Sequence, residues 1–224
     1  MGLLEVQTSS RWRWTESISL LVIFTALAAS VKLHLGWVTS LDQGVAGWLT
    51  GWENSSRTAG FIMVSKFGSP LVATILAVAL ILWLWWKRER IAAGISFLIY
   101  FCGNALALAV KYLVGRVRPM HELVADSGFS FPSGHVFSST LLILLLLLIL
   151  NHYLEFGGQF LATVAAVLWL GMLMIARVYL RNHYATDVLG SVLLASGWLM
   201  ASQLICSVII ARVPRLANIQ GDDE

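Results

Sequence analysis

Six long apolar runs set the strongest constraint on what this chain can fold into. Runs of about 17 to 25 apolar residues can cross a bilayer as helices. We place six of them at Ile18–Leu35, Leu71–Trp86, Ile91–Val114, Val136–Leu150, Phe160–Val178 and Val188–Ala211. Only 12% of the 224 residues are charged and 58% are hydrophobic, whereas soluble domains carry about 25% charged residues. The sequence therefore predicts an all-α bundle of six transmembrane helices.

We interpret residues 1–224 as a single integral membrane domain with a polar tail from about residue 215. The connection from Gly36 to Ser69 is long and contains Trp37, Trp48 and Trp52, which predicts an interfacial helical segment between the first two spans. The first run follows "RWRW" and contains "ALAAS", a small-residue stretch that resembles the cleavage site of a signal peptide. We favour a retained first helix, with cleavage as the alternative.

The composition also excludes several classes of partner. The pI is near 9.1, but the basic residues are scattered between apolar runs, so we expect no nucleic-acid partner. Cys102 and Cys206 lie inside apolar runs, and no Cys/His spacing typical of zinc is present. We therefore expect no metal, no cofactor and no disulfide, and no obligate protein partner is evident.

The unusual polar residues fall at alternate ends of the predicted spans. Arg118 follows the third span and His135 begins the fourth, so both lie on one side of the membrane. The fourth and fifth spans form a hairpin, which returns Arg177 to that same side, just before His183 and Asp187. Charges next to membrane spans are costly and usually paired or functional. The sequence predicts one polar site at one end of the bundle.

The spacing within this set favours an anion site. Lys111 and Arg118 are two helical turns apart, and Pro119 should end the helix there. Ser133 and Gly134 begin the fourth helix, where free backbone N–H groups bind anions. The other members are His135 and Arg177, with His183 and Asp187 one turn apart. Three cations, a helix N-terminus and two histidines together indicate phosphoryl transfer.

Three motifs carry a family resemblance. They are "KYLVGRVRP" at 111–119, "PSGH" at 132–135 and "RVYLRNHYATD" at 177–187. In this order and spacing, the chain resembles the membrane branch of the type 2 phosphatidic acid phosphatase family, over most of its length. One departure is Ala176, because the family usually has a serine before the third-motif arginine.

The resemblance implies a metal-independent lipid phosphatase with a phosphohistidine intermediate. His183 would be the nucleophile, Asp187 would orient its imidazole, and His135 would protonate the leaving oxygen. The phosphate would be held by the remaining motif residues, which are Lys111, Arg118, Ser133, Gly134 and Arg177. Bacterial members of similar size act on phosphatidylglycerophosphate, phosphatidic acid or polyprenyl diphosphates. Among these substrates we favour phosphatidylglycerophosphate or undecaprenyl diphosphate, without choosing between them.

Two other functions remain as alternatives. An intramembrane serine protease would use Ser133 as its nucleophile, and an anion transporter would use the cations alone. Arg116 and Arg181 stand outside the motifs, and we interpret them as interfacial anchors. We interpret the loop residues His121, Glu122 and Asp126 as solvated, and we assign no chemistry to His34, His121 or His152.

The orientation is predicted from the short "KRER" loop at 87–90 and the tryptophans around it. A short basic loop favours the cytoplasm, and this would place the polar site on the outer side of a bacterial cell membrane. The total count of basic residues does not favour this orientation. Several of the outer cations belong to the predicted site, however, so they carry little information on topology.

Overall fold

A computed structural model describes residues 11–212, which form eight helices with no strand in that range. The helices are α1 Arg11–Lys32, α2 Gly36–Thr50, α3 Ser55–Phe67, α4 Pro70–Trp86, α5 Arg90–Val114, α6 Gly134–Tyr153, α7 Phe156–Tyr179 and α8 Ala185–Arg212. The polar tail predicted from about residue 215 lies outside the described residues.

Six helical segments in this range are long and apolar enough to cross a membrane. The helices α1, α5, α6, α7 and α8 each supply one, and α3 with α4 forms the sixth. This confirms the predicted all-α bundle and its six spans. The first span ends at Lys32 rather than at Leu35, because the chain turns at His34, whose φ is +53°.

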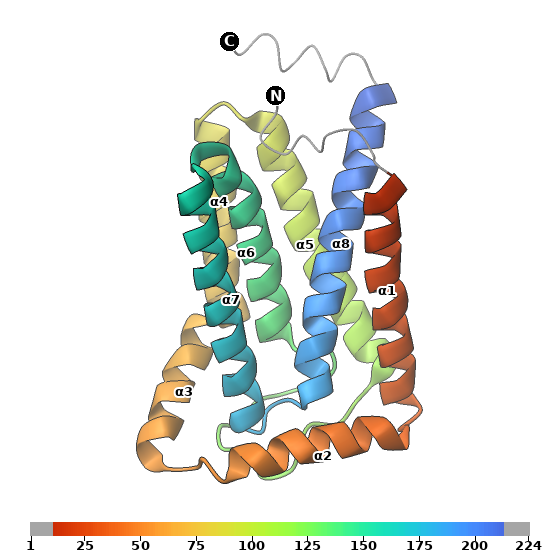
Figure 1. Ribbon diagram of the computed structural model, residues 1–224, viewed down its shortest axis with the longest axis vertical. Coiled ribbons are helices and arrows are strands. Elements are labelled where there is room, and N and C mark those ends of the chain that lie inside the picture. Colours follow the sequence, from red (N-terminus) through yellow and green to blue (C-terminus); the bar gives the residue numbers. More distant parts are fainter. Residues whose placement is uncertain (1–10, 213–224) are drawn as a thin grey trace.

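The helix α2 lies crosswise under one end of the bundle, below α7 and α8 (Figure 1). Val38, Asp42 and Leu49 are on its buried face, whereas Trp37 and Trp48 are exposed. This confirms the predicted helical segment between the first two spans. The chain then rises through α3 into α4, where Ser69 caps the helix and Pro70 occupies its first turn.

The helix α6 is the most buried of the spans and packs against α4, α5, α7 and α8. Its Phe137, Leu141 and Leu145 lie in the main hydrophobic core. Large apolar side chains also point outward from the bundle, among them Leu71, Trp86 and Phe156. Such an exposed apolar surface is costly in water and suits a lipid environment.

The connections at the α2 end of the bundle hold the predicted polar residues. α5 ends and α6 begins at this end, and the turn from α7 to α8 lies beside them (Figure 1). The alternation of spans therefore brings together three segments that are far apart in the sequence. α2 covers these segments from below.

Candidate active site

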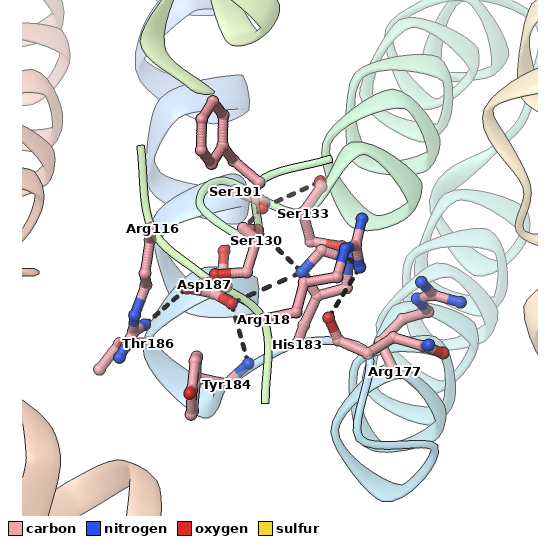
Figure 2. A network of polar contacts seen from close by, with 12 residues as sticks. Arg116, Arg118, Ser130, Ser133, Arg177, His183, Tyr184, Thr186, Asp187 and Ser191 are labelled. Atoms are coloured by element: carbon pink, nitrogen blue, oxygen red, sulfur yellow. Dashed lines mark hydrogen bonds and ion pairs between the residues drawn. The ribbon is translucent and has the colours of Figure 1, made fainter. Parts of the chain in front are cut away.

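Four segments converge at the polar end of the bundle: the loop after α5, the start of α6, the end of α7 and the start of α8 (Figure 2). Gly115 ends α5 in the left-handed conformation, with φ at +68°, and its N–H donates to the carbonyl of Lys111. A glycine in this conformation is a common helix terminator. It turns the chain towards the site immediately after α5.

His183 is the buried centre of the site, with 1% of its surface exposed. Its Nδ1 lies 2.8 Å from the Ser130 carbonyl and 3.5 Å from Oδ2 of Asp187, while Nε2 lies 3.4 Å from Nη1 of Arg118. Because a carbonyl can only accept, Nδ1 carries the proton and Nε2 keeps its lone pair. The tautomer expected from the contact with Asp187 is therefore fixed at least as strongly by the Ser130 carbonyl.

The pKa of His183 is lowered to about 4. Burial is the main cause, because it penalises the charged imidazolium. The positive charges of Arg177 and Arg118 lower the pKa further, whereas the contact with Asp187 raises it. The imidazole is therefore neutral at physiological pH and available as a nucleophile.

Arg118 and Arg177 meet near this imidazole. Arg118 donates to the carbonyls of three residues, Ser127, Gly128 and Asn182. Arg177, which is 3% exposed, donates to Oγ of Ser65 at 2.6 Å. Ala176 cannot supply the hydroxyl that the resemblance led us to expect, and Arg177 has a hydroxyl contact from α3 instead.

Asp126 is an exposed loop residue, as interpreted from the sequence, but its carboxylate is also paired with two arginines of the site. Its carboxylate forms ion pairs with Arg177 at 2.5 Å and with Arg118 at 3.1 Å, and 25% of its side chain is exposed. The sequence places Asp126 in a loop of mixed polarity, where nothing local reveals a partner on α7. The long-range pairing appears only when the loop folds back over the end of the bundle.

The start of α6 carries buried polar groups without partners. Ser133 is 0% exposed, and its Oγ has no hydrogen-bond partner among the described residues. Within the same range, Nε of Arg177 is also unpaired. Buried polar atoms are normally satisfied, so these two groups suit a ligand rich in acceptors. His135 is half-buried as the second residue of α6, and Nζ of Lys111 donates to the Phe129 carbonyl at 2.7 Å.

The interpretation of Arg116 as an interfacial anchor is wrong. Its Nη1 lies 2.6 Å from Oδ1 of Asp187 and its Nη2 lies 2.5 Å from Oδ2 of Asp42. The side chain is only 12% exposed. The pattern Arg116-Val117-Arg118 was a weak indication that Arg116 belongs to the site, because it places two cations just after the glycine that ends α5.

Arg181 forms a more exposed ion pair with Glu53, at 2.5 Å. It connects the turn between α7 and α8 with the residues that follow α2. Its anchoring role at a membrane surface stays a prediction. Within residues 11–212, no group of three or more His, Cys, Asp or Glu side chains is arranged to hold a metal ion.

The fold and the site define a multi-pass membrane protein with cations and imidazoles gathered at one end. The model of the PAP2 superfamily matches residues 93–206, a little more than half of the chain. The chain therefore belongs to the PAP2 superfamily, and it is a hydrolase that acts on phosphate esters.

Relatives agree with this assignment. The chain is 30% identical over 185 residues to phosphatidylglycerophosphatase B of Bacillus subtilis. The matched region covers 77% of this chain and 86% of that protein. It is 31% identical over 107 residues to decaprenylphosphoryl-5-phosphoribose phosphatase of Mycobacterium tuberculosis, which covers 46% of this chain and 52% of that protein.

Two crystal structures share the fold. The PAP2-type phosphatidylglycerolphosphate phosphatase of Bacillus subtilis matches with a TM-score of 0.70 at 23% identity, over 88% of this chain and 96% of that one. LpxE of Aquifex aeolicus matches with a TM-score of 0.53 at 17% identity, over 77% of this chain and 96% of that one. At these identities the likeness supports the fold alone.

Proposed function

We propose that this protein hydrolyses the phosphate monoester or diphosphate of a membrane lipid through a phosphohistidine on His183. One observation carries the proposal: the buried neutral imidazole donates Nδ1–H to the Ser130 carbonyl and directs Nε2 towards Arg118. A lone pair is thus directed to the place where fixed cations would hold a phosphoryl group. This is the arrangement that an in-line attack on phosphorus needs.

In the first step, Nε2 of His183 attacks phosphorus while the bond from phosphorus to the lipid oxygen breaks. His135 gives its proton to that oxygen, so the lipid leaves with a free hydroxyl group, or as a monophosphate when the substrate is a diphosphate. Positive charge develops on the imidazole as the phosphorus–nitrogen bond forms. The carboxylate of Asp187, 3.5 Å from Nδ1, would stabilise this charge.

In the second step, water attacks the phosphohistidine and the phosphorus–nitrogen bond breaks. His135, now neutral, accepts the proton of the water, and inorganic phosphate is released. In both steps the charge on the phosphoryl oxygens would be stabilised by fixed donors. These donors are Lys111, Arg118, Arg177, the hydroxyl of Ser133 and the N–H of Gly134.

The serine-protease alternative is less well supported by the same contacts. A serine nucleophile needs a base within hydrogen-bond reach, but Oγ of Ser133 has no partner among the described residues. Nδ1 of His183 faces Ser130 and Asp187. An anion transporter would need neither the fixed tautomer nor the buried imidazole.

Within lipid phosphates, we favour phosphatidylglycerophosphate as the substrate, with undecaprenyl diphosphate as the second candidate. The relative at 30% identity is named for the first of these, and the Mycobacterium tuberculosis relative is named for a polyprenyl lipid. Membrane lipids are the only partners that the proposal requires.

A panel assay tests the function. Purified protein in detergent is given phosphatidylglycerophosphate, phosphatidic acid and undecaprenyl diphosphate, and the release of inorganic phosphate is measured for each. We expect the highest kcat/KM on phosphatidylglycerophosphate and no release by the His183→Ala variant. Equal release by the parent and this variant would overturn the proposed chemistry, and a preference for the diphosphate would overturn the substrate ranking.

We also propose that the site opens to the outer side of a bacterial cell membrane. Met120 is 82% exposed at the site end, and Lys87 lies in the connection at the opposite end. In a background without Cys102 and Cys206, Met120→Cys should react with an impermeant thiol reagent in intact cells. Lys87→Cys should react only after the membrane is broken. The opposite pattern would reverse the orientation.

A further inference from the structure

The crosswise helix α2 contributes one buried carboxylate, that of Asp42, to the site. Asp42 is the only charged residue of α2 and is 3% exposed. Its Oδ1 accepts the N–H of Thr186 at 2.9 Å, and its Oδ2 accepts the hydroxyl of Thr186 at 2.9 Å. Because Thr186 precedes Asp187 in the first turn of α8, Asp42 fixes the backbone next to that carboxylate.

Arg116 joins this carboxylate to Asp187. One guanidinium nitrogen contacts Oδ2 of Asp42 and another contacts Oδ1 of Asp187. The guanidinium also lies 3.9 Å from the ring centroid of Tyr184. Charge-assisted hydrogen bonds on two nitrogens of a planar group restrict its position strongly. Figure 2 shows Arg116, Thr186 and Asp187 side by side at the start of α8.

Both oxygens of Asp187 are thereby occupied. Oδ1 accepts from Arg116, and Oδ2 accepts the N–H of Tyr184 at 2.9 Å while lying 3.5 Å from Nδ1 of His183. With one oxygen bound on each side, the carboxylate cannot rotate freely. It therefore keeps Oδ2 directed to the imidazole.

We infer that Arg116 and Asp42 are positioning residues for the phosphatase reaction, because they hold the carboxylate of Asp187 against His183. This inference rests on the proposed function of His183. The competing explanation is that the ion pairs only attach α2 to the bundle. Buried ion pairs carry a desolvation cost and can often be replaced without loss of the fold. If kcat depends on Arg116 in a folded variant, attachment of α2 to the bundle does not by itself explain that dependence.

The first test is Arg116→Lys, which keeps the charge but cannot contact both carboxylates in the same way. We expect kcat for phosphate release to fall about tenfold to a hundredfold, the range seen when partners of directly acting groups are removed. KM should change by less than about threefold, because Arg116 does not bind the phosphate. The ¹⁵N shifts of the His183 imidazole should move even without substrate.

A double-mutant cycle shows whether Arg116 acts through Asp187. In an Asp187→Asn background, Arg116→Lys should lower kcat by less than about threefold, because the group that it positions is already lost. Equal losses in the two backgrounds would overturn the inference. The parent enzyme and the His183→Ala variant measured alongside show separately whether the proposed phosphatase chemistry holds.

Asp42→Asn is the second variant, and Glu53→Gln is its matched control. Glu53 also connects the residues after α2 with the turn between α7 and α8, through Arg181. Both changes remove one carboxylate charge, but only Asp42 contacts Arg116. We expect Asp42→Asn to lower kcat and shift the His183 signals, whereas Glu53→Gln leaves both unchanged. A loss of thermal stability in Asp42→Asn with kcat and ¹⁵N shifts unchanged in the folded protein would leave docking as the only role and overturn the inference.

Discussion

Asp126 accepts a hydrogen bond from Nη2 of Arg177 at 2.5 Å, and the same oxygen lies 3.1 Å from Nη1 of Arg118. Two of the three cations proposed to bind phosphate are therefore bridged by one carboxylate of the protein itself. Burial alone would raise the pKa of Asp126, but the N–H of Ser127 and the two guanidinium groups lower it below the usual value. The carboxylate stays charged and competes with an anionic ligand.

Asp126→Asn should therefore strengthen phosphate binding. Removing a negative charge beside the phosphoryl oxygens removes a repulsion, so we expect KM and the inhibition constant of inorganic phosphate to fall by about threefold to tenfold. Both are measured by steady-state phosphate release at fixed ionic strength. Glu53→Gln gives the same change in net charge away from the two arginines and should leave both constants unaltered. Weaker phosphate inhibition in Asp126→Asn would mean that the carboxylate orients the arginines.

The His183 imidazole should stay neutral well below the usual pKa of histidine. Its pKa is lowered to about 4, first by burial, so the neutral form persists as the pH falls from 6.5 to about 5. Titration of ¹⁵N-labelled histidine by NMR, with the His183 signals assigned by comparison with His183→Gln, measures this directly. Protonation of His183 near pH 6.5 would contradict the expectation.

The two histidines should differ when each is removed. We expect His183→Ala to abolish phosphate release from every lipid, because no other group forms the covalent bond. His135→Ala should lose most activity on a monoester and less on a diphosphate, whose leaving group needs protonation less. Acid-labile phosphohistidine, measured after quenching, should accumulate in His135→Ala with the diphosphate. Its accumulation in His183→Ala would place the nucleophile elsewhere.

Asp187→Asn should lower kcat by about 10²-fold. In a serine-protease triad the analogous change costs about 10⁴, because there the carboxylate decides the tautomer. Here the Ser130 carbonyl still accepts Nδ1–H, so the expected loss is mainly that of charge stabilisation. KM should change little, because the phosphate-binding cations remain. A kcat within a few-fold of the parent value would leave Asp187 with a structural role only.

Chelation should leave the activity unchanged. The charges that a metal could supply are already provided by three fixed cations, Lys111, Arg118 and Arg177. We therefore expect equal rates of phosphate release with EDTA and with added magnesium, assayed on protein freed of metals beforehand. Loss of activity in EDTA that magnesium restores would contradict this prediction.

The sequence interpretation missed two sets of contacts for the same physical reason. Arg116 is 74 residues from its partner Asp42, and Arg177 is 51 residues from Asp126. Spacing along the chain predicts near neighbours such as His183 and Asp187, although His183 lies in the turn before α8 rather than on the same helix face. It does not predict how an irregular loop folds back, and so the partners of Arg116 and Asp126 could not be read from it.

The sequence by itself determined the membrane architecture and the end of the bundle where the chemistry gathers. An apolar run of about 20 residues crosses the bilayer completely as a helix. The number of spans between two motifs therefore decides whether the motifs lie on the same side of the membrane. Only the tertiary structure decided which groups surround His183. Ser130 contacts it from a loop, whereas Arg116 and Asp42 are connected to it through Asp187. Those long-range contacts depend on packing and charge pairing in three dimensions, which no local period in the sequence encodes.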